Sequence, residues 1–242
     1  MALRRIETDG KSFDISYDII NPSAKKDIIF LHGWGSNKEI MKVFIPYFDN
    51  FRQVYIDLPG FGKSSNDYVL KTQDYAKIVD KFLDSAGIKK DVIIGHSFGG
   101  KVATLLNPDL LVLLSSAGIV MPKPLSVRLK IKTYKIFKKL GLQGVRKFFV
   151  SADAKGMSEN MYETFKNVVD EDFSEFFRKF KGKALVFGGD KDTAVPAEAV
   201  KKQAELLNSK IIMLSGDHYF FFNGTSAAEN REKIKEEILK AL

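Results

Sequence analysis

Six short apolar runs recur along the chain, and each is bounded by charged residues or glycine. Within each run the hydrophobic residues follow one another without the polar and apolar alternation of a half-exposed strand. Unbroken runs of Val, Ile and Leu are typical of strands that are buried on both faces of a parallel sheet. The runs cover residues 27–31, 53–57, 91–95, 110–114, 183–188 and 210–214. This pattern limits the chain to folds in which helices cover both faces of a sheet.

The first twenty residues follow a different pattern. Residues 13–19 alternate between apolar and polar side chains, which is the period of a strand with one face exposed. Asp9 and Gly10 come just before them and form a typical hairpin turn. We therefore expect the sheet to start with antiparallel strands. Together with the six later runs, this start predicts a mostly parallel sheet of eight strands.

Helical patterns lie between the strands. In residues 72–86 the apolar side chains share one helical face, and Thr72 is the expected N-cap. Residues 226–242 show the same kind of pattern. Alternation of strands and helices indicates an α/β class, in which functional residues lie in loops at the carboxyl ends of the strands.

One segment interrupts this alternation. Residues 118–181 carry helical patterns and no convincing strand. We therefore expect a helical lid over residues 118–181, inserted into a core made of residues 1–117 and 182–242.

The positive charge of the chain is concentrated in this insert. Residues 119–150 hold nine basic residues and no acidic one, whereas the whole chain carries +8, so the remainder carries −1. The nine are Lys123, Arg128, Lys130, Lys132, Lys135, Lys138, Lys139, Arg146 and Lys147. The favoured interpretation is the solvated outer face of a lid helix. Attraction to anionic substrates or to a membrane surface is the less favoured alternative, and no nucleic-acid partner is expected.

Several classes of protein are excluded by composition. The chain has no cysteine, so disulfides, thiol nucleophiles and thiolate zinc sites are impossible. Charged residues stand where the apolar core of an export signal would lie, and the longest apolar stretch, residues 110–121, is shorter than the roughly 20 residues of a membrane span. We expect a soluble, cytoplasmic protein.

The pentapeptide Gly95-His96-Ser97-Phe98-Gly99 matches the pattern G-x-S-x-G. It follows one of the buried runs directly and precedes a helical pattern. This is the setting of a nucleophile elbow, in which a serine occupies a strained turn between strand and helix. The small residues on either side allow the backbone to fold that tightly. Ser97 is therefore the candidate nucleophile.

A serine hydroxyl needs a base to remove its proton, and that base is usually an imidazole oriented by a carboxylate. The chain has three histidines. His218 lies in the loop after the last apolar run and is the predicted base. His96 is expected to leave the turn in another direction, and His32 precedes a glycine loop. We expect His32 and His96 to order loops. With His218 engaged in catalysis and no cysteine, neither a metal nor a cofactor is expected.

Three aspartates are candidates for the orienting acid. Asp190 and Asp192 both follow the run at 183–188, and a helix is expected to start near Pro196. Asp217 adjoins His218 in sequence and would have difficulty folding back onto its ring. Asp190 and Asp192 therefore both remain as candidates on position alone.

Four blocks together resemble the α/β-hydrolase fold serine hydrolases. They are His32-Gly33-Trp34-Gly35, Asp57-Leu58-Pro59-Gly60-Phe61-Gly62-Lys63-Ser64, the Ser97 pentapeptide, and residues 189–196 with His218 beyond. The resemblance implies this fold and a triad in the order Ser97, Asp192, His218, and so it favours Asp192 over Asp190. It also implies an oxyanion hole formed by the backbone N–H groups of Trp34 and Phe98.

Part of the second block is similar to a phosphate-binding loop. Gly62-Lys63-Ser64 matches the end of that motif, but the glycine required five residues earlier is replaced by Asp57. We therefore do not expect nucleotide binding.

Three functions fit these residues. The first is hydrolysis of a small carboxylic ester through an acyl-enzyme. The second is hydrolysis of a carbon–carbon bond in a 2-hydroxy-6-oxo-dienoate, but members of the family with that activity commonly have Asn before the serine and Trp after the histidine, where this chain has His96 and Tyr219. The third is a non-catalytic binding protein, which would have no need of a complete triad.

Overall fold

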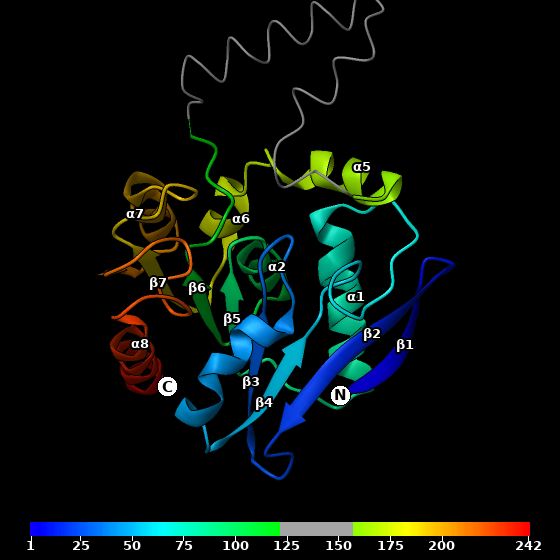
Figure 1. Cartoon of the computed structure of the whole chain (residues 1–242), viewed down its shortest axis with the longest axis horizontal. Coiled ribbons are helices and arrows are strands. Elements are labelled where there is room, and N and C mark those ends of the chain that lie inside the picture. Colours follow the sequence, from blue (N-terminus) through cyan, green and yellow to red (C-terminus); the bar gives the residue numbers. More distant parts are fainter. Residues whose placement is uncertain (122–156) are drawn as a thin grey trace, which may run out of the picture.

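The computed structural model describes residues 1–121 and 157–242. Within them an eight-stranded sheet has the order β1-β2-β4-β3-β5-β6-β7-β8 (Figure 1). The strands are β1 (Ala2–Thr8), β2 (Lys11–Ile20), β3 (Lys26–Leu31), β4 (Phe51–Ile56), β5 (Val92–His96), β6 (Leu110–Leu114), β7 (Lys183–Gly189) and β8 (Lys210–Leu214). The predicted sheet is confirmed.

The strands at the two ends of the sheet pair in different directions, as the sequence pattern predicts. β1 and β2 pair antiparallel with Thr8 opposite Lys11, and the turn between them has positive φ at Asp9 (50°) and Gly10 (70°). β2 also pairs antiparallel with β4, whereas every later pair in the sheet is parallel. All strands from β3 onward therefore end at the same edge, where their following loops meet.

Helices flank the sheet on both faces. The described helices are the 3₁₀ helix η1 (Lys38–Tyr47) and the α-helices α1 (Thr72–Ser85), α2 (Phe98–Leu106), α5 (Glu159–Val168), α6 (Ser174–Lys179), α7 (Ala197–Leu206) and α8 (Ala227–Ala241). The expectation for Thr72 was wrong by one residue. Lys71 is the N-cap of α1, and its N–H donates to the Asp74 carboxylate at 2.7 Å, which stabilises the helix start.

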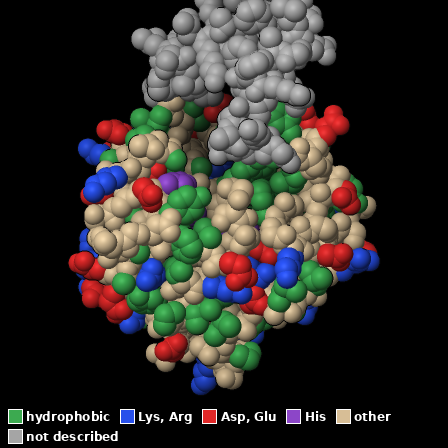
Figure 2. Space-filling model, viewed as in Figure 1, with side chains coloured by type: hydrophobic (Ala, Val, Ile, Leu, Met, Phe, Trp, Pro, Cys, Tyr) green, Lys and Arg blue, Asp and Glu red, His purple; other side chains and the backbone are tan. Residues whose placement is uncertain are grey.

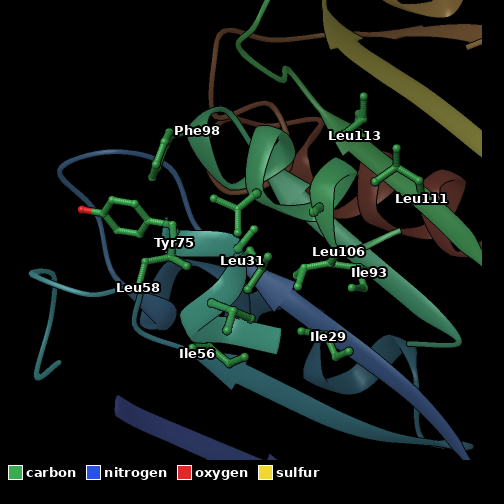
Figure 3. Packing of buried hydrophobic residues seen from close by; sticks show 14 of the residues in the cluster. Ile29, Leu31, Ile56, Leu58, Tyr75, Ile93, Phe98, Leu106, Leu111 and Leu113 are labelled. Atoms are coloured by element: carbon green, nitrogen blue, oxygen red, sulfur yellow. The ribbon is translucent and has the colours of Figure 1, made fainter. Parts of the chain in front are cut away.

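Two apolar clusters lie on opposite faces of the sheet. Along β3, Ile29 and Leu31 belong to the larger cluster, whereas Phe30 belongs to the smaller one. The larger cluster joins the sheet to α1, α2 and α7, and Figure 3 shows Leu31 and Ile93 of neighbouring strands beside α2. The smaller cluster joins it to η1 and α8. Burial on both faces explains why the parallel strands read as unbroken apolar runs.

The described end of the predicted insert packs against the core. On α5, Thr164 accepts a hydrogen bond from the Leu70 N–H at 3.0 Å. The buried Lys101 ammonium of α2 donates to the Val168 carbonyl and to the Glu171 carboxylate, both at 2.8 Å. Residues 157–181 contain helices and no strand. Residues 122–156, with the basic residues from Lys123 to Lys147, lie outside the described residues, so the lid and the domain division stay predictions.

Within the described residues, no helix is long and apolar enough to cross a membrane.

A buried ion pair fixes the loop after β4. The carboxylate of Asp57 accepts the backbone N–H and the ammonium of Lys38, each at 2.8 Å, and the N–H of Lys63 at 3.1 Å. Lys38 is 2% exposed and Asp57 is 1% exposed. Gly62 has a φ of 57°, and a Cβ there would collide with this carboxylate. The loop that is similar to a phosphate-binding loop is therefore folded around its own carboxylate.

This ion pair leads to a stability prediction. Lys38→Met leaves a buried carboxylate without its counter-charge, and the free energy of unfolding should fall by about 3 kcal/mol. The matched control is Lys235→Met, which removes an exposed pair with Glu232 on α8 and should cause little change. Urea denaturation of the two variants measures the difference. Equal losses would show that the Asp57 carboxylate does not depend on Lys38.

Candidate active site

Four loops meet at the carboxyl ends of β3, β5, β7 and β8. β4 and β5 lie on opposite sides of β3, so the chain changes direction across the sheet at this point. Ligand sites in open α/β sheets commonly form where such a reversal leaves a crevice. The fold therefore brings the loops that carry the predicted site residues, which are far apart in sequence, to one edge of the sheet.

Ser97 occupies a strained turn between β5 and α2. Its φ is 50° and its ψ is −117°, a conformation that side-chain-bearing residues rarely adopt. Its N–H donates to the Leu114 carbonyl at 3.1 Å, and its own carbonyl accepts the N–H groups of Gly100 at 3.0 Å and Ala117 at 3.1 Å. These bonds to β6 and the following loop hold the turn, as the predicted elbow requires.

Two glycines, Gly95 and Gly99, allow this turn to form. A Cβ at Gly95 would collide with the backbone of Gly99 and Gly100 on the first turn of α2. A Cβ at Gly99 would collide with the carbonyl oxygens of Leu31 and His32, where α2 crosses the end of β3. The small residues around Ser97 are therefore needed because backbone packs directly on backbone.

His218 and Asp192 are joined as the triad prediction requires. The Nδ1 of His218 lies 2.8 Å from the Oδ2 of Asp192. The Asp192 side chain has 0% exposure, and the His218 side chain has 18%. Histidine is visible on the surface in Figure 2, and since His32 and His96 are fully buried, it is His218 that reaches the solvent. Asp190 instead accepts the Gly216 N–H at 2.8 Å, and so Asp192 is the aspartate that contacts the imidazole.

The Asp192 carboxylate is held in its ionised form. Burial alone would raise its pKa, but hydrogen bonds from His218 and from the Val195 N–H lower the pKa below its ordinary value. The carboxylate also accepts the Ala194 N–H at 2.8 Å. Because the folded pKa is the lower one, the stabilisation is present above the unfolded pKa of about 3.9 and is lost as the pH falls through the folded value.

His32 orders the loop after β3. Its Nδ1 lies 2.7 Å from the Gly33 carbonyl, to which it donates, and its Nε2 accepts the Leu58 N–H at 3.0 Å. Burial lowers its pKa to about 4, so the ring is neutral and can both donate and accept. In a trans peptide the N–H points opposite to the carbonyl. The bond to Gly33 therefore turns the N–H of Trp34 away from His32.

The two predicted oxyanion donors are backbone N–H groups, one in the loop after β3 and one at the start of α2. Within the described part of the chain, neither the Trp34 N–H nor the Phe98 N–H donates to an acceptor. A Cβ at Gly33 would lie 3.0 Å from the Cβ of Ser97, so the Trp34 loop comes close to the nucleophile. The Trp34 ring packs on Phe61, Phe98 and Phe165 at centroid distances of 4.8, 5.5 and 5.4 Å, and its indole N–H is buried without a partner among the described residues.

His96 has a contact that sequence reasoning missed. It contacts the loop of the predicted base, where its ring lies 4.7 Å from that of His218. A histidine beside a serine carries no sequence signal for such a contact, since the partner is 122 positions away.

The described residues show no hydrogen bond between Ser97 and His218. Contacts between nucleophile and base are often long in free enzymes and shorten when substrate binds. No group of three or more potential metal ligands occurs among residues 1–121 and 157–242.

Comparison with known proteins identifies the family. A family model described as the alpha/beta hydrolase family matches residues 28–229. The chain belongs to the alpha/beta hydrolase family. It is an enzyme of the α/β-hydrolase type, in agreement with the resemblance in its sequence.

Relatives of this α/β-hydrolase include named hydrolases. It is 26% identical to the uncharacterized hydrolase YugF of Bacillus subtilis, over 88% of this chain and 89% of that protein. It is 29% identical to a pimeloyl-[acyl-carrier protein] methyl ester esterase of Vibrio campbellii, over 64% of this chain and about half (51%) of that enzyme. Among solved structures, a thermophilic esterase from Thermogutta terrifontis superimposes with a TM-score of 0.74 at 17% identity, covering 100% of this chain and 99% of the other, which shows the fold.

The glycine contacts at the elbow predict a specific loss of stability. Gly99→Ala should lower the free energy of unfolding by about 2 to 3 kcal/mol, because the added methyl group meets two carbonyl oxygens. Gly87→Ala is the control, since Gly87 has a φ of 61° and open space around it. That control should lose only about 1 kcal/mol from its positive φ. A Gly99→Ala variant as stable as the wild type would contradict the close approach of α2 to β3.

Proposed function

We propose that this α/β-hydrolase cleaves a small carboxylic ester through an acyl-enzyme, with Ser97, His218 and Asp192 as its triad. The observation that carries the proposal is the 2.8 Å bond between His218 and the buried Asp192, in loops packed against the elbow of Ser97. A carboxylate held this way selects the tautomer in which Nε2 of His218 is free to accept a proton.

The reaction follows from these positions. Ser97 Oγ attacks the ester carbonyl while its proton passes to Nε2 of His218. The backbone N–H groups of Trp34 and Phe98 stabilise the tetrahedral oxyanion. The intermediate then collapses, and the alcohol leaves with the proton from His218. Water, deprotonated by His218, attacks the acyl-enzyme, which releases the acid and restores Ser97.

The choice of an ester rests on the relatives. The Vibrio campbellii relative is named for cleaving a methyl ester, and so small alkyl esters are the first substrates to test. Hydrolysis of a carbon–carbon bond in a dienoate is the second candidate. A panel of methyl esters with graded acyl length, run beside a 2-hydroxy-6-oxo-dienoate, separates the two. Turnover of the dienoate alone would replace the ester proposal.

The role of Ser97 has a direct test. Ser97→Ala removes the nucleophile and should lower kcat by about 10³ to 10⁶-fold with little change in stability. Labelling by a fluorophosphonate probe should disappear, since the probe needs the activated hydroxyl. Ser116→Ala serves as the control, because Ser116 lies in the loop beside the elbow and is outside the proposed triad. Normal labelling of the Ser97→Ala variant would rule out Ser97 as the nucleophile.

The role of Asp192 can be separated from that of Asp190. Asp192→Asn removes the charge that orients and stabilises the His218 imidazole, and kcat should fall by about 10³ to 10⁴-fold. Asp190→Asn should keep kcat within about tenfold, because the Asp190 carboxylate accepts only the Gly216 N–H among the described residues. Steady-state kinetics on the best ester of the panel measures both. The reverse ranking would assign the acid to Asp190.

A further inference from the structure

His96 makes a hydrogen bond to the backbone of the proposed base. It is the last residue of β5, directly before Ser97, and it has 0% exposure. Its Nε2 lies 3.0 Å from the carbonyl oxygen of His218. A carbonyl can only accept, so the Nε2 of His96 carries the proton and donates.

The imidazole of His96 is neutral. Burial is the main cause that lowers its pKa to about 3, and repulsion by the nearby His218 adds to it. With the proton on Nε2, Nδ1 is unprotonated, and within the described residues it is buried without a partner. The donor therefore keeps the same form throughout the neutral range.

The ring is also confined by its neighbours. It packs against Tyr219 at 5.1 Å and Phe221 at 5.0 Å between ring centroids, in addition to His218. On another side, a Cβ at Gly33 would lie 3.0 Å from its Nδ1. A ring fixed by packing gives its hydrogen bond a defined direction.

We propose that His96 is a positioning residue that holds the His218 loop at a fixed place relative to Ser97. The inference rests on the proposed function, in which His218 is the base. The bond to Asp192 fixes one atom of the His218 ring, and the bond from His96 fixes the backbone that carries the ring. Together they restrain the base at two points, and one of them belongs to the residue adjacent to the nucleophile. Catalysis is sensitive to the position of the His218 imidazole relative to Ser97, because a misplacement of about 1 Å can cost about 10²-fold in rate.

Three variants test whether the donor position matters. His96→Gln places an amide nitrogen near the position of Nε2 and should keep kcat within about fivefold. His96→Asn places its amide nitrogen near the position of Nδ1, too far from the His218 carbonyl, and kcat should fall about 10 to 100-fold with KM little changed. His96→Leu keeps much of the volume without a donor and should match His96→Asn, which covers the case in which the Asn variant folds poorly.

A second measurement does not depend on catalysis. Hydrogen exchange of the backbone amides at residues 217–221 should quicken in the Asn and Leu variants and remain close to wild type in the Gln variant. Two outcomes would overturn the inference. One is equal exchange in all four proteins. The other is an equal loss of kcat in the three variants that parallels their loss of stability in urea. If wild type neither hydrolyses esters nor reacts with the fluorophosphonate probe, the proposed function fails, and the exchange data still decide whether His96 holds the loop.

Discussion

Direct packing of backbone on backbone around Ser97 is the constraint on which the rest of the site depends. Gly95 and Gly99 let the first turn of α2 lie against β5 and the end of β3, where a side chain would collide. This contact sets the strained conformation of Ser97 and leaves the Phe98 N–H without an acceptor among the described residues. It also brings Gly33 against the nucleophile. The apolar clusters on both faces of the sheet supply the stability that supports this strain.

All three histidines of the chain lie at this edge of the sheet, and burial gives them different tasks. His32 and His96 are fully buried and neutral, so each can act as a hydrogen-bond donor to a backbone carbonyl, of Gly33 and of His218 respectively. His218 is partly exposed and bonded to a carboxylate. Under the proposed function, the two buried rings hold loops, and the partly exposed third ring acts as the base.

Much of this arrangement could be predicted because it depends on local patterns. Unbroken apolar runs identified the six parallel strands to within two residues, since burial on both faces leaves no polar position. The turn at Asp9 and the setting of Ser97 also carry local signals. The choice of Asp192 over Asp190 came from resemblance alone, because two residues of the same type follow one strand and only tertiary structure shows which faces the imidazole.

Other features left no pattern in the sequence. η1 was not predicted, since its start is fixed by the buried pair of Lys38 and Asp57, which are 19 positions apart. A buried lysine looks the same in sequence as a solvated one. The same holds for Lys101, which joins α2 to the last residue of α5 and to Glu171 beyond it. Such long-range polar contacts are specific to one fold and are not visible in periodicity or composition.

The position of Trp34 has a spectroscopic consequence. The chain has a single tryptophan, so its intrinsic tryptophan fluorescence comes entirely from the loop that carries one proposed oxyanion donor. The indole contacts Phe98 beside the nucleophile and Phe165 on α5, and its N–H is buried without a partner in the described part of the chain. Emission from an indole shifts in wavelength when water or a hydrogen-bond acceptor reaches it. The protein therefore carries its own optical probe, which reads the surroundings of Ser97 without any added label.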